Sequence, residues 1–201
     1  MTMNLKFATL ATALVAVAGC FDEPVSADRT VPVEARVYLK EMGLKDLSSV
    51  KDKFAFAGID YVNLDRNELT NVSEVTGIAT LKWLRLNGNR LSAAPDFSAL
   101  RSLRRVYLAD NRLETVPESL KDLPELTDID LSGNPIAEVP DWLAAKKGLL
   151  FLSFNRTRLT KLPDDLSAWR SLRALQLGDI RFAPEELKRI RAALPDTAVV
   201  F

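Results

Sequence analysis

The sequence lacks histidine and has only one cysteine, Cys20, among its 201 residues. Without histidine, the chain has neither the commonest general base nor the commonest metal-binding side chain, and Ser-His and Cys-His nucleophile pairs are excluded. A single cysteine can form neither an intramolecular disulfide nor a zinc site on its own. We therefore expect a protein that is not an enzyme and that uses no metal or other cofactor.

An excess of charge of either sign is also absent, since Lys plus Arg and Asp plus Glu both number 27. A general binder of nucleic acid would carry a large basic excess, so we expect no nucleic-acid partner. A glycine-rich phosphate-binding loop is missing as well. Apolar residues make up 47% of the chain, which is enough for a buried core.

Long hydrophobic runs are limited to one, from residue 7 to residue 19. As a helix this run would rise about 20 Å, which is too short for a bilayer core of about 30 Å. A short basic start, an apolar middle and small residues at the end are typical of a secretory signal peptide, which we assign to residues 1–19. A buried core helix is the alternative.

The end of this run, Val17-Ala18-Gly19-Cys20, resembles the lipobox of bacterial lipoproteins. The resemblance implies cleavage before Cys20, lipid attachment to that cysteine, and a membrane-anchored lipoprotein at the bacterial cell envelope. Because Phe21 rather than aspartate follows the cysteine, it also implies the outer membrane if the source is Gram-negative. Residues 20–33, which are polar and contain prolines, would then be a lipidated tether. Ordinary cleavage after Ala18 is the alternative, and would give a secreted or periplasmic protein.

A repeat covers most of the remaining chain. Its frame is LxxLxLxxNxL, and successive copies begin 22 or 23 residues apart. The six copies are Ile59-Val62-Leu64-Asn67-Leu69, Leu81-Leu84-Leu86-Asn89-Leu91, Leu103-Val106-Leu108-Asn111-Leu113, Leu126-Ile129-Leu131-Asn134-Ile136, Leu149-Leu152-Phe154-Thr157-Leu159 and Leu172-Leu175-Leu177-Ile180-Phe182.

This frame and step resemble the leucine-rich repeat. The resemblance implies an α/β fold, a leucine-rich-repeat solenoid of about six coils of 22–23 residues, with short parallel strands on the concave face and a helical or irregular convex face. An open repeat would expose its core, so both ends need covers. We assign residues 34–58 to an N-terminal cap, 59–182 to the repeats and 183–201 to a C-terminal cap.

The asparagine of the frame is expected to turn inward and bond backbone groups of its own and adjacent coils. A buried asparagine without such bonds would cost about 1–3 kcal/mol, so the residue fits only where a ladder exists. Thr157 can replace part of it and Ile180 cannot, which predicts a regular array that is modified toward its end. The predicted structural ladder consists of Asn67, Asn89, Asn111 and Asn134.

The convex side also repeats, with a proline at the start of a short helical segment in three copies: Pro117, Pro140 and Pro163. Trp142 and Trp169 lie on this side near helical core positions. We interpret both as packing residues rather than ligand contacts.

The two ends show cap signals. Residues 33–43 carry apolar side chains at helical spacing (Val37, Leu39, Met42), and we expect this segment to help cover the front. Residues 184–194 begin with proline, then acids, then basic residues, which predicts a helix. Residues 198–201 are expected to form a final strand.

Strand alternation places two side chains per copy on the outside of the concave sheet, at the third and fifth frame positions. Aromatic and arginine residues, which are enriched at binding hot spots, gather there. Charge is segregated along the repeats: Lys82, Arg85, Arg104 and Arg105 lie in the second and third copies, and the acids lie in later copies. The candidate partner-binding residues are Tyr61, Trp83, Arg85, Arg105, Tyr107, Asp128, Asp130 and Phe151.

These features favour a monomeric, non-catalytic protein-binding module that meets an unidentified protein partner through its concave face. Asp128 and Asp130 face the same way on one strand, but an open sheet gives a carboxylate pair no cleft for glycoside hydrolysis. A glycan or cell-wall binder is one alternative, since aromatic rings can stack on sugars. A passive envelope scaffold, in which the face residues only pair with each other, is the other.

Overall fold

The computed structural model describes residues 35–93 and 95–201. The expected signal peptide, Cys20 and the expected tether lie outside the described residues. The described part contains eight strands that form one sheet in chain order, with every neighbouring pair parallel. They are β1 (Ala35–Tyr38), β2 (Ile59–Asn63), β3 (Trp83–Arg85), β4 (Arg105–Tyr107), β5 (Asp128–Asp130), β6 (Phe151–Ser153), β7 (Ala174–Gln176) and β8 (Ala198–Val200).

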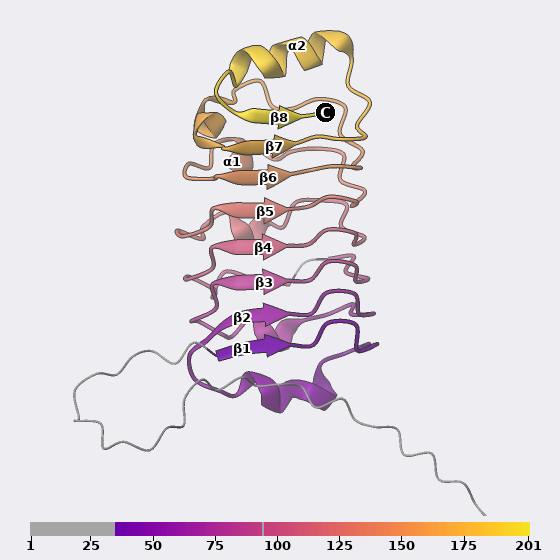
Figure 1. The fold of residues 1–201 in the computed structure, drawn as a ribbon, viewed down its shortest axis with the longest axis vertical. Helices are drawn as coiled ribbons and strands as arrows, with labels where there is room; N and C mark the ends of the chain where they lie inside the picture. The colour runs from indigo at the N-terminus through magenta and orange to yellow at the C-terminus, as the bar shows by residue number, and fades with distance from the viewer. Residues whose placement is uncertain (1–34, 94) are drawn as a thin grey trace, which may run out of the picture.

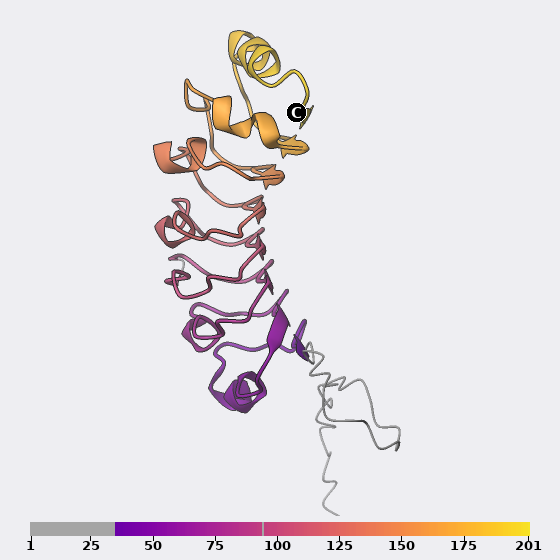
Figure 2. The same cartoon turned by 90° about the vertical axis from the view of Figure 1, so that its left-hand side faces the viewer.

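This arrangement confirms the predicted solenoid. Strands β2 to β7 coincide with the six copies of the repeat, and the second apolar residues of the copies pair in register along the sheet, as Val62 with Leu84 and Leu84 with Val106. One coil therefore stacks on the next without a shift (Figure 1). Turned by 90°, the molecule is curved, with the strands along the inner side of the curve (Figure 2).

The outer side of the curve carries short helical segments, most of them 3-10 helices (Figure 2). A coil of 22 or 23 residues leaves room for only one or two helical turns between strands, and each of Pro117 and Pro140 directly precedes one. The segments are η1 (Ser48–Phe54), η2 (Ser73–Val75), η3 (Glu118–Leu120), α1 (Asp141–Ala144), η4 (Ser167–Ser171) and the longer α2 (Pro184–Ala193).

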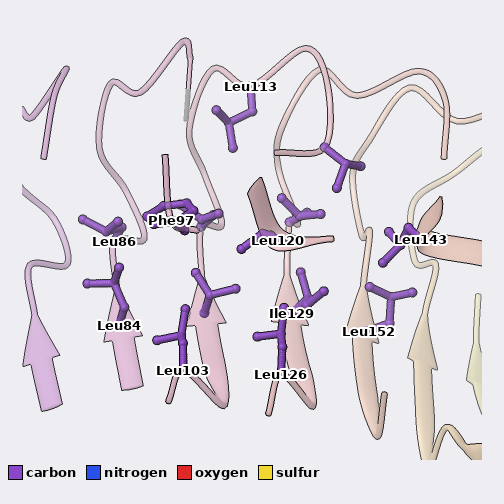
Figure 3. Packing of buried hydrophobic residues seen from close by; sticks show 14 of the residues in the cluster. Leu84, Leu86, Phe97, Leu103, Leu113, Leu120, Leu126, Ile129, Leu143 and Leu152 are labelled. Atoms are coloured by element: carbon purple, nitrogen blue, oxygen red, sulfur yellow. The ribbon is translucent and has the colours of Figure 1, made fainter. Parts of the chain in front are cut away.

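The core fills the space between the strands and the outer segments (Figure 3). Leu84 and Leu103 approach it from the sheet side, and Leu120 and Leu143 meet them from the convex side; all four are fully buried. Burying each such side chain contributes about 1.5–3 kcal/mol. Trp169 is fully buried too, and its indole N–H donates to the carbonyl of Leu143 at 2.9 Å.

The frame asparagines lie inside the stack and connect each coil to the one before it. The amide of Asn111 donates to the carbonyl oxygens of Leu108 in its own coil and Leu86 in the preceding coil, at 3.0 and 2.9 Å. Its side-chain oxygen accepts the backbone N–H of Leu91. Asn89 and Asn134 repeat this pattern. Each side chain therefore satisfies backbone groups that the turn after the strand leaves unpaired.

The helical spacing of residues 33–43 is misleading, because the described part of this segment is strand β1 and a turn. Val37 and Leu39 are buried and point inward at a period of two, as in the other strands, whereas Met42 is exposed. The turn after β1 has no asparagine of its own. Asn67 of the next coil bonds back to this turn as the other frame asparagines bond to theirs: its Oδ1 accepts the N–H of Leu44, and in addition that of Met42.

The other end follows the prediction, with helix α2 and strand β8 closing the stack (Figure 1). Ile190 and Leu194 are buried against the last coil. Glu186 and Arg189 hold the helix in place: Glu186 accepts the backbone N–H of Leu162 at 2.8 Å, and Arg189 donates to the Leu162 carbonyl at 3.0 Å. In the described part of the chain, no helix has the length and apolarity that crossing a bilayer requires.

Candidate functional site

The candidate site is the concave face, formed by the outward side chains of the sheet. Strand pairing aligns these side chains in two rows across the coils. The first row is Arg36, Tyr61, Trp83, Arg105, Asp128, Phe151 and Ala174, and the second is Tyr38, Asn63, Arg85, Tyr107, Asp130, Ser153 and Gln176. The structure therefore brings all eight predicted partner-binding residues onto one surface.

Three aromatic rings, Tyr38, Tyr61 and Trp83, form a continuous strip that we call the aromatic diagonal. The ring centroids of Tyr38 and Tyr61 lie 5.2 Å apart, and those of Tyr61 and Trp83 lie 5.8 Å apart, with tilts of 41° and 57°. Tyr38 is 44% exposed and Trp83 37% exposed, although aromatic rings usually bury most of their surface. The strip crosses three coils and leaves much of its apolar area in contact with solvent.

Sequence reasoning missed Tyr38, because it treated the first strand as a cap. The signal that could have found it is the pair Val37 and Leu39, which alternates with Tyr38 as the inward residues of a strand do. Burial among the neighbouring rings raises the pKa of Tyr61, while a hydrogen bond from Asn63 acts in the opposite direction.

The early basic side chains of the face are already paired with carboxylates. Arg85 donates from Nε to the Oδ2 of Asp65 at 2.7 Å, its Nη2 forms an ion pair with the same oxygen at 2.7 Å, and its guanidinium carbon lies 5.2 Å from the ring centre of Tyr107. Burial is the largest single influence on the pKa of Arg85 and lowers it, but the hydrogen bond to Asp65 and the attraction of nearby negative groups together raise it above its ordinary value. Lys82 is also paired with a carboxylate, since its Nζ lies 3.8 Å from the Oδ2 of Asp60.

Arg105 lies between an aromatic ring and an acid. Its guanidinium carbon is 4.3 Å from the ring centre of Trp83, and its Nε is 3.6 Å from the Oδ1 of Asp128. A guanidinium in this position covers one side of the indole and fixes its tilt. The basic band expected from the sequence is thus present, but its charge is largely neutralised within the protein.

The acidic end of the face lies on β5. Thr127 donates its hydroxyl to Asp128 at 2.5 Å, and Asp130 accepts both the backbone N–H and the hydroxyl of Ser132, at 3.0 and 2.6 Å. Among the residues that the structure describes, Asp130 has no basic side chain within ion-pair distance. Its charge is the one on this part of the face that a partner can neutralise.

Not every fifth-position side chain is open to solvent. Ser153 is 1% exposed, and its hydroxyl lies 2.6 Å from that of Ser132 and 3.2 Å from the side-chain oxygen of Gln176. Asn63 is also buried. The side chains at these two positions are hydrogen-bonded within the protein and offer a partner little contact area. Strand alternation alone did not predict their burial.

A second polar ladder runs through the turns after the strands and was not predicted. Asp65 accepts the backbone N–H of Asn87 at 2.8 Å, and Asn87 accepts that of Ala109 at the same distance. Near the other end, Asn155 accepts the N–H of Gly178 at 2.6 Å. Asp65, the partner of Arg85, is therefore itself held in place by a hydrogen bond from the next coil.

Groups of three or more His, Cys, Asp or Glu side chains that could hold a metal ion do not occur within residues 35–93 and 95–201. Asp128 and Asp130 are the only close carboxylate pair among the predicted site residues. They lie on the open sheet rather than in a cleft, which does not suit acid–base catalysis on a bound substrate.

Comparison with known proteins agrees with this architecture. Residues 80–136 match the family model of the leucine rich repeat. A solved leucine-rich-repeat protein of Leptospira interrogans aligns with 26% identity and a TM-score of 0.63, over 75% of this chain and 45% of that one. A solved internalin of Listeria monocytogenes aligns with 18% identity and a TM-score of 0.67, over 82% of this chain and 46% of that one.

The chain thus spans less than half the length of either solved protein, and it shares their leucine-rich-repeat solenoid. No curated protein has a significantly similar sequence.

Proposed function

We propose that this chain is a non-catalytic module of the bacterial cell envelope that binds a protein partner through its concave face. The observation that carries the proposal is the aromatic diagonal, a strip of Tyr38, Tyr61 and Trp83 whose two end residues, Tyr38 and Trp83, are exposed. The solenoid architecture supports it only by association, since the fold hosts many functions.

The core residues and the face residues differ sharply in burial. The inward neighbours of Trp83 in the sheet, Val62, Leu84 and Val106, are fully buried and hold the coils together. Trp83 lies on the outside, where it contacts the ring of Tyr61 and the guanidinium of Arg105 and remains 37% exposed. Tryptophan, tyrosine and arginine are the residue types that most often dominate binding energy, and here they are clustered near the centre of an open surface.

A glycan partner has less support from the geometry. Sugar rings stack on an open aromatic face, whereas one side of the Trp83 indole is occupied by Arg105 at 4.3 Å. The tilts of 41° and 57° along the aromatic diagonal also leave no flat platform for consecutive sugar rings. Protein segments adapt better to such an uneven surface because their side chains vary in size and direction.

A passive scaffold is the second alternative. It explains the pairs Arg85–Asp65 and Arg105–Asp128 as sheet stabilisation, but it gives no reason for the exposed rings of Tyr38 and Trp83. Exposed aromatic clusters of this kind usually mark interaction sites.

The proposal places the module at the envelope, as a monomer anchored by lipid at Cys20. The support is the resemblance of residues 17–20 to a lipobox and the bacterial source of the similar solved protein from Leptospira interrogans. Ordinary secretion to the periplasm or medium is the alternative location. Labelling cells with radioactive palmitate, with Cys20→Ser as the control, distinguishes the two locations.

Photo-crosslinking in cells tests the binding face. A photoreactive amino acid replaces Trp83 in the full chain, and a matched probe replaces Lys121 on the convex side; adducts are identified by mass spectrometry. A discrete protein adduct from position 83 alone is the expected result. The same adducts from both positions, or none from position 83, would contradict a concave-face protein binder.

A further inference from the structure

We propose that one flank of the solenoid is a second binding surface, which takes an acidic segment of a protein partner in an extended conformation. The flank is formed by the turns that follow the strands, beyond the arrowheads in Figure 1. The inference goes beyond the proposed function, which concerns the concave face. Three features carry it: a row of exposed arginines, the pairing of most acids beside that row, and the composition of the surface around it.

The arginines occupy one position of the repeat frame, directly after the ladder asparagine or the residue that replaces it. The coils stay stacked at this position, since the backbone N–H of Arg112 donates to the carbonyl of Leu91 at 2.9 Å and that of Arg158 to the carbonyl of Ile136 at 2.8 Å. Equivalent residues therefore follow one another along the solenoid axis. The arginine row, as we call it, consists of four exposed residues: Arg90, Arg112, Arg158 and Arg181.

Most acids beside the arginine row are already neutralised. They lie in the row's own frame position or two residues earlier, where the backbone has a positive φ. Asp179 is the one acid at these two positions without an ion pair in the described part of the chain. The paired acids and their partners are Glu41 with Arg66 and Asp110 with Arg156, both at 2.8 Å, and Glu68 with Arg90 at 3.1 Å.

Three guanidinium groups of the row remain without a counter-charge. Among the described residues, no carboxylate lies within ion-pair distance of Arg112, Arg158 or Arg181. The flank therefore carries a surplus of positive charge, although the whole chain has a formal net charge of zero. A guanidinium binds a carboxylate through two parallel hydrogen bonds, and clusters of arginines are a recurrent means of recognising acidic segments.

The composition of the flank favours a peptide over a glycan or a membrane surface. At the two frame positions all residues are charged except glycines and Pro135, so the flank offers no aromatic ring on which a sugar could stack. A membrane surface is contacted by large apolar side chains together with basic ones, and these positions supply only the basic ones. A single row of guanidinium groups along the axis fits a linear acidic chain.

The length of the row sets the length of the segment. Arg112 and Arg181 are three coils apart, which corresponds to about 14 Å at the spacing of neighbouring strands. An extended peptide advances about 3.3 Å per residue, so a segment of about five residues spans this distance. Because arginine side chains are long and flexible, acids at several positions of such a segment can reach them.

The test uses nuclear magnetic resonance on the full chain labelled with ¹⁵N, and the probe peptide acetyl-GEEEEEEG-amide at low salt. The peptide is expected to shift the backbone amide signals of Arg112, Arg158 and Arg181. The indole signal of Trp83 on the concave face is expected to stay in place. A peptide with glutamine in place of glutamate has the same length without the charge, and is expected to cause no shift.

Two triple variants that lose the same charge test the position of the surface. The first combines Arg112→Gln, Arg158→Gln and Arg181→Gln, and is expected to weaken binding of the glutamate peptide about tenfold, since each exposed ion pair contributes modestly. The control variant is expected to bind like the unmodified chain. It replaces three other exposed basic residues without an ion pair in the described structure by glutamine: Lys51, Arg170 and Arg173.

The outcomes separate this inference from the proposed function. Equal weakening in both triple variants would overturn the inference, because net charge alone would then explain the binding. Shifts at the three arginines caused by hexagalacturonate, without shifts caused by the glutamate peptide, would overturn it in favour of an anionic glycan. A protein adduct from position 83 supports the concave-face binder whichever result the flank gives, since the two surfaces share no residue.

Discussion

Arg156 donates a 2.8 Å hydrogen bond from Nη2 to the Oδ1 of Asp110, although a complete coil lies between them. The intervening coil carries Gly133 at the corresponding position. A Cβ built on that glycine would lie 2.1 Å from the same oxygen of Asp110. All three residues have a positive φ, of 54° at Asp110, 66° at Gly133 and 56° at Arg156. The missing side chain in the middle coil therefore lets the ion pair join the coils on either side.

Replacing Gly133 by alanine is expected to destabilise the fold by about 1–2 kcal/mol. The alanine strains a backbone with φ of +66°, and its methyl group displaces the Asp110 carboxylate from Arg156. Urea unfolding followed by circular dichroism measures the change. Gly77→Ala is the matched control, since a Cβ there meets no atom within 4 Å, and it should be close to neutral.

A double variant separates the two causes. If the displaced ion pair contributes, Asp110→Ala combined with Gly133→Ala will cost less than the sum of the single changes, because the two residues are in contact. A strictly additive result would show that backbone strain at Gly133 accounts for the whole loss.

The ladder asparagines should be much more costly to replace than the threonine that follows them. Asn111→Ala leaves the N–H of Leu91 without its acceptor and removes one of the two amide donors to the carbonyl of Leu86, so we expect a loss of about 2–3 kcal/mol in the free energy of unfolding. Thr157 donates only to Phe154 in its own coil, and Thr157→Val should cost less than about 1 kcal/mol. Equal losses at both positions would mean that bonds between coils add nothing to stability.

The sequence was informative about the fold because one short frame specifies strand, turn and stacking together. The inward residues of each copy bury fully, and the asparagine has a use only when another coil lies beside it. The frame did not reveal the strand at residues 35–38, because Met42 occupies the asparagine position in the turn that follows it. Asn67 of the next coil still bonds back to this turn, as the predicted ladder requires, so only the asparagine of this turn itself is missing.

The rows of the candidate site could also be predicted, but not the state of their charges. Alternation along a strand places Arg85 and Arg105 outward whatever their neighbours are. Asp65, which holds Arg85, lies in the turn after β2 rather than on a strand. The reach of a long arginine side chain to that turn depends on the three-dimensional stacking of coils. In the structure, the arginines of the predicted basic band are therefore paired with carboxylates, and the aromatic rings are the main feature of this surface.

The C-terminal cap should depend on pH through Glu186. Its hydrogen bond with Arg189 holds the pKa of the carboxyl below the ordinary value of a glutamate, and the bond from the Leu162 N–H acts in the same direction. A lowered pKa in the folded state means that the carboxylate stabilises the fold above its unfolded pKa of about 4.3, and that this contribution is lost as the pH falls through the lowered value.

Glu186→Gln is accordingly expected to cost about 1–2 kcal/mol at pH 7. The difference from the unmodified chain should shrink in acid, since the protonated glutamate resembles glutamine. Urea midpoints at pH 7 and pH 3 measure the effect, with Glu114→Gln, an exposed side chain, as the control. A difference that is the same at both pH values would show that shape, and not charge, explains the loss.

Trp83→Ala should separate binding from folding. The ring makes its contacts with Tyr61 and Arg105 on the outside of the sheet, so its removal creates no cavity in the core and should shift the melting temperature by only about a degree. Affinity for the partner captured from position 83 should fall by about 2 kcal/mol, which is roughly thirtyfold. Phe56→Ala, which removes another exposed aromatic ring outside the concave face, should leave affinity unchanged.

If the two variants lost affinity equally, the partner would be responding to general hydrophobicity. If Trp83→Ala instead lowered the melting temperature by many degrees, the ring would be a structural element, and its exposure would no longer argue for a binding role.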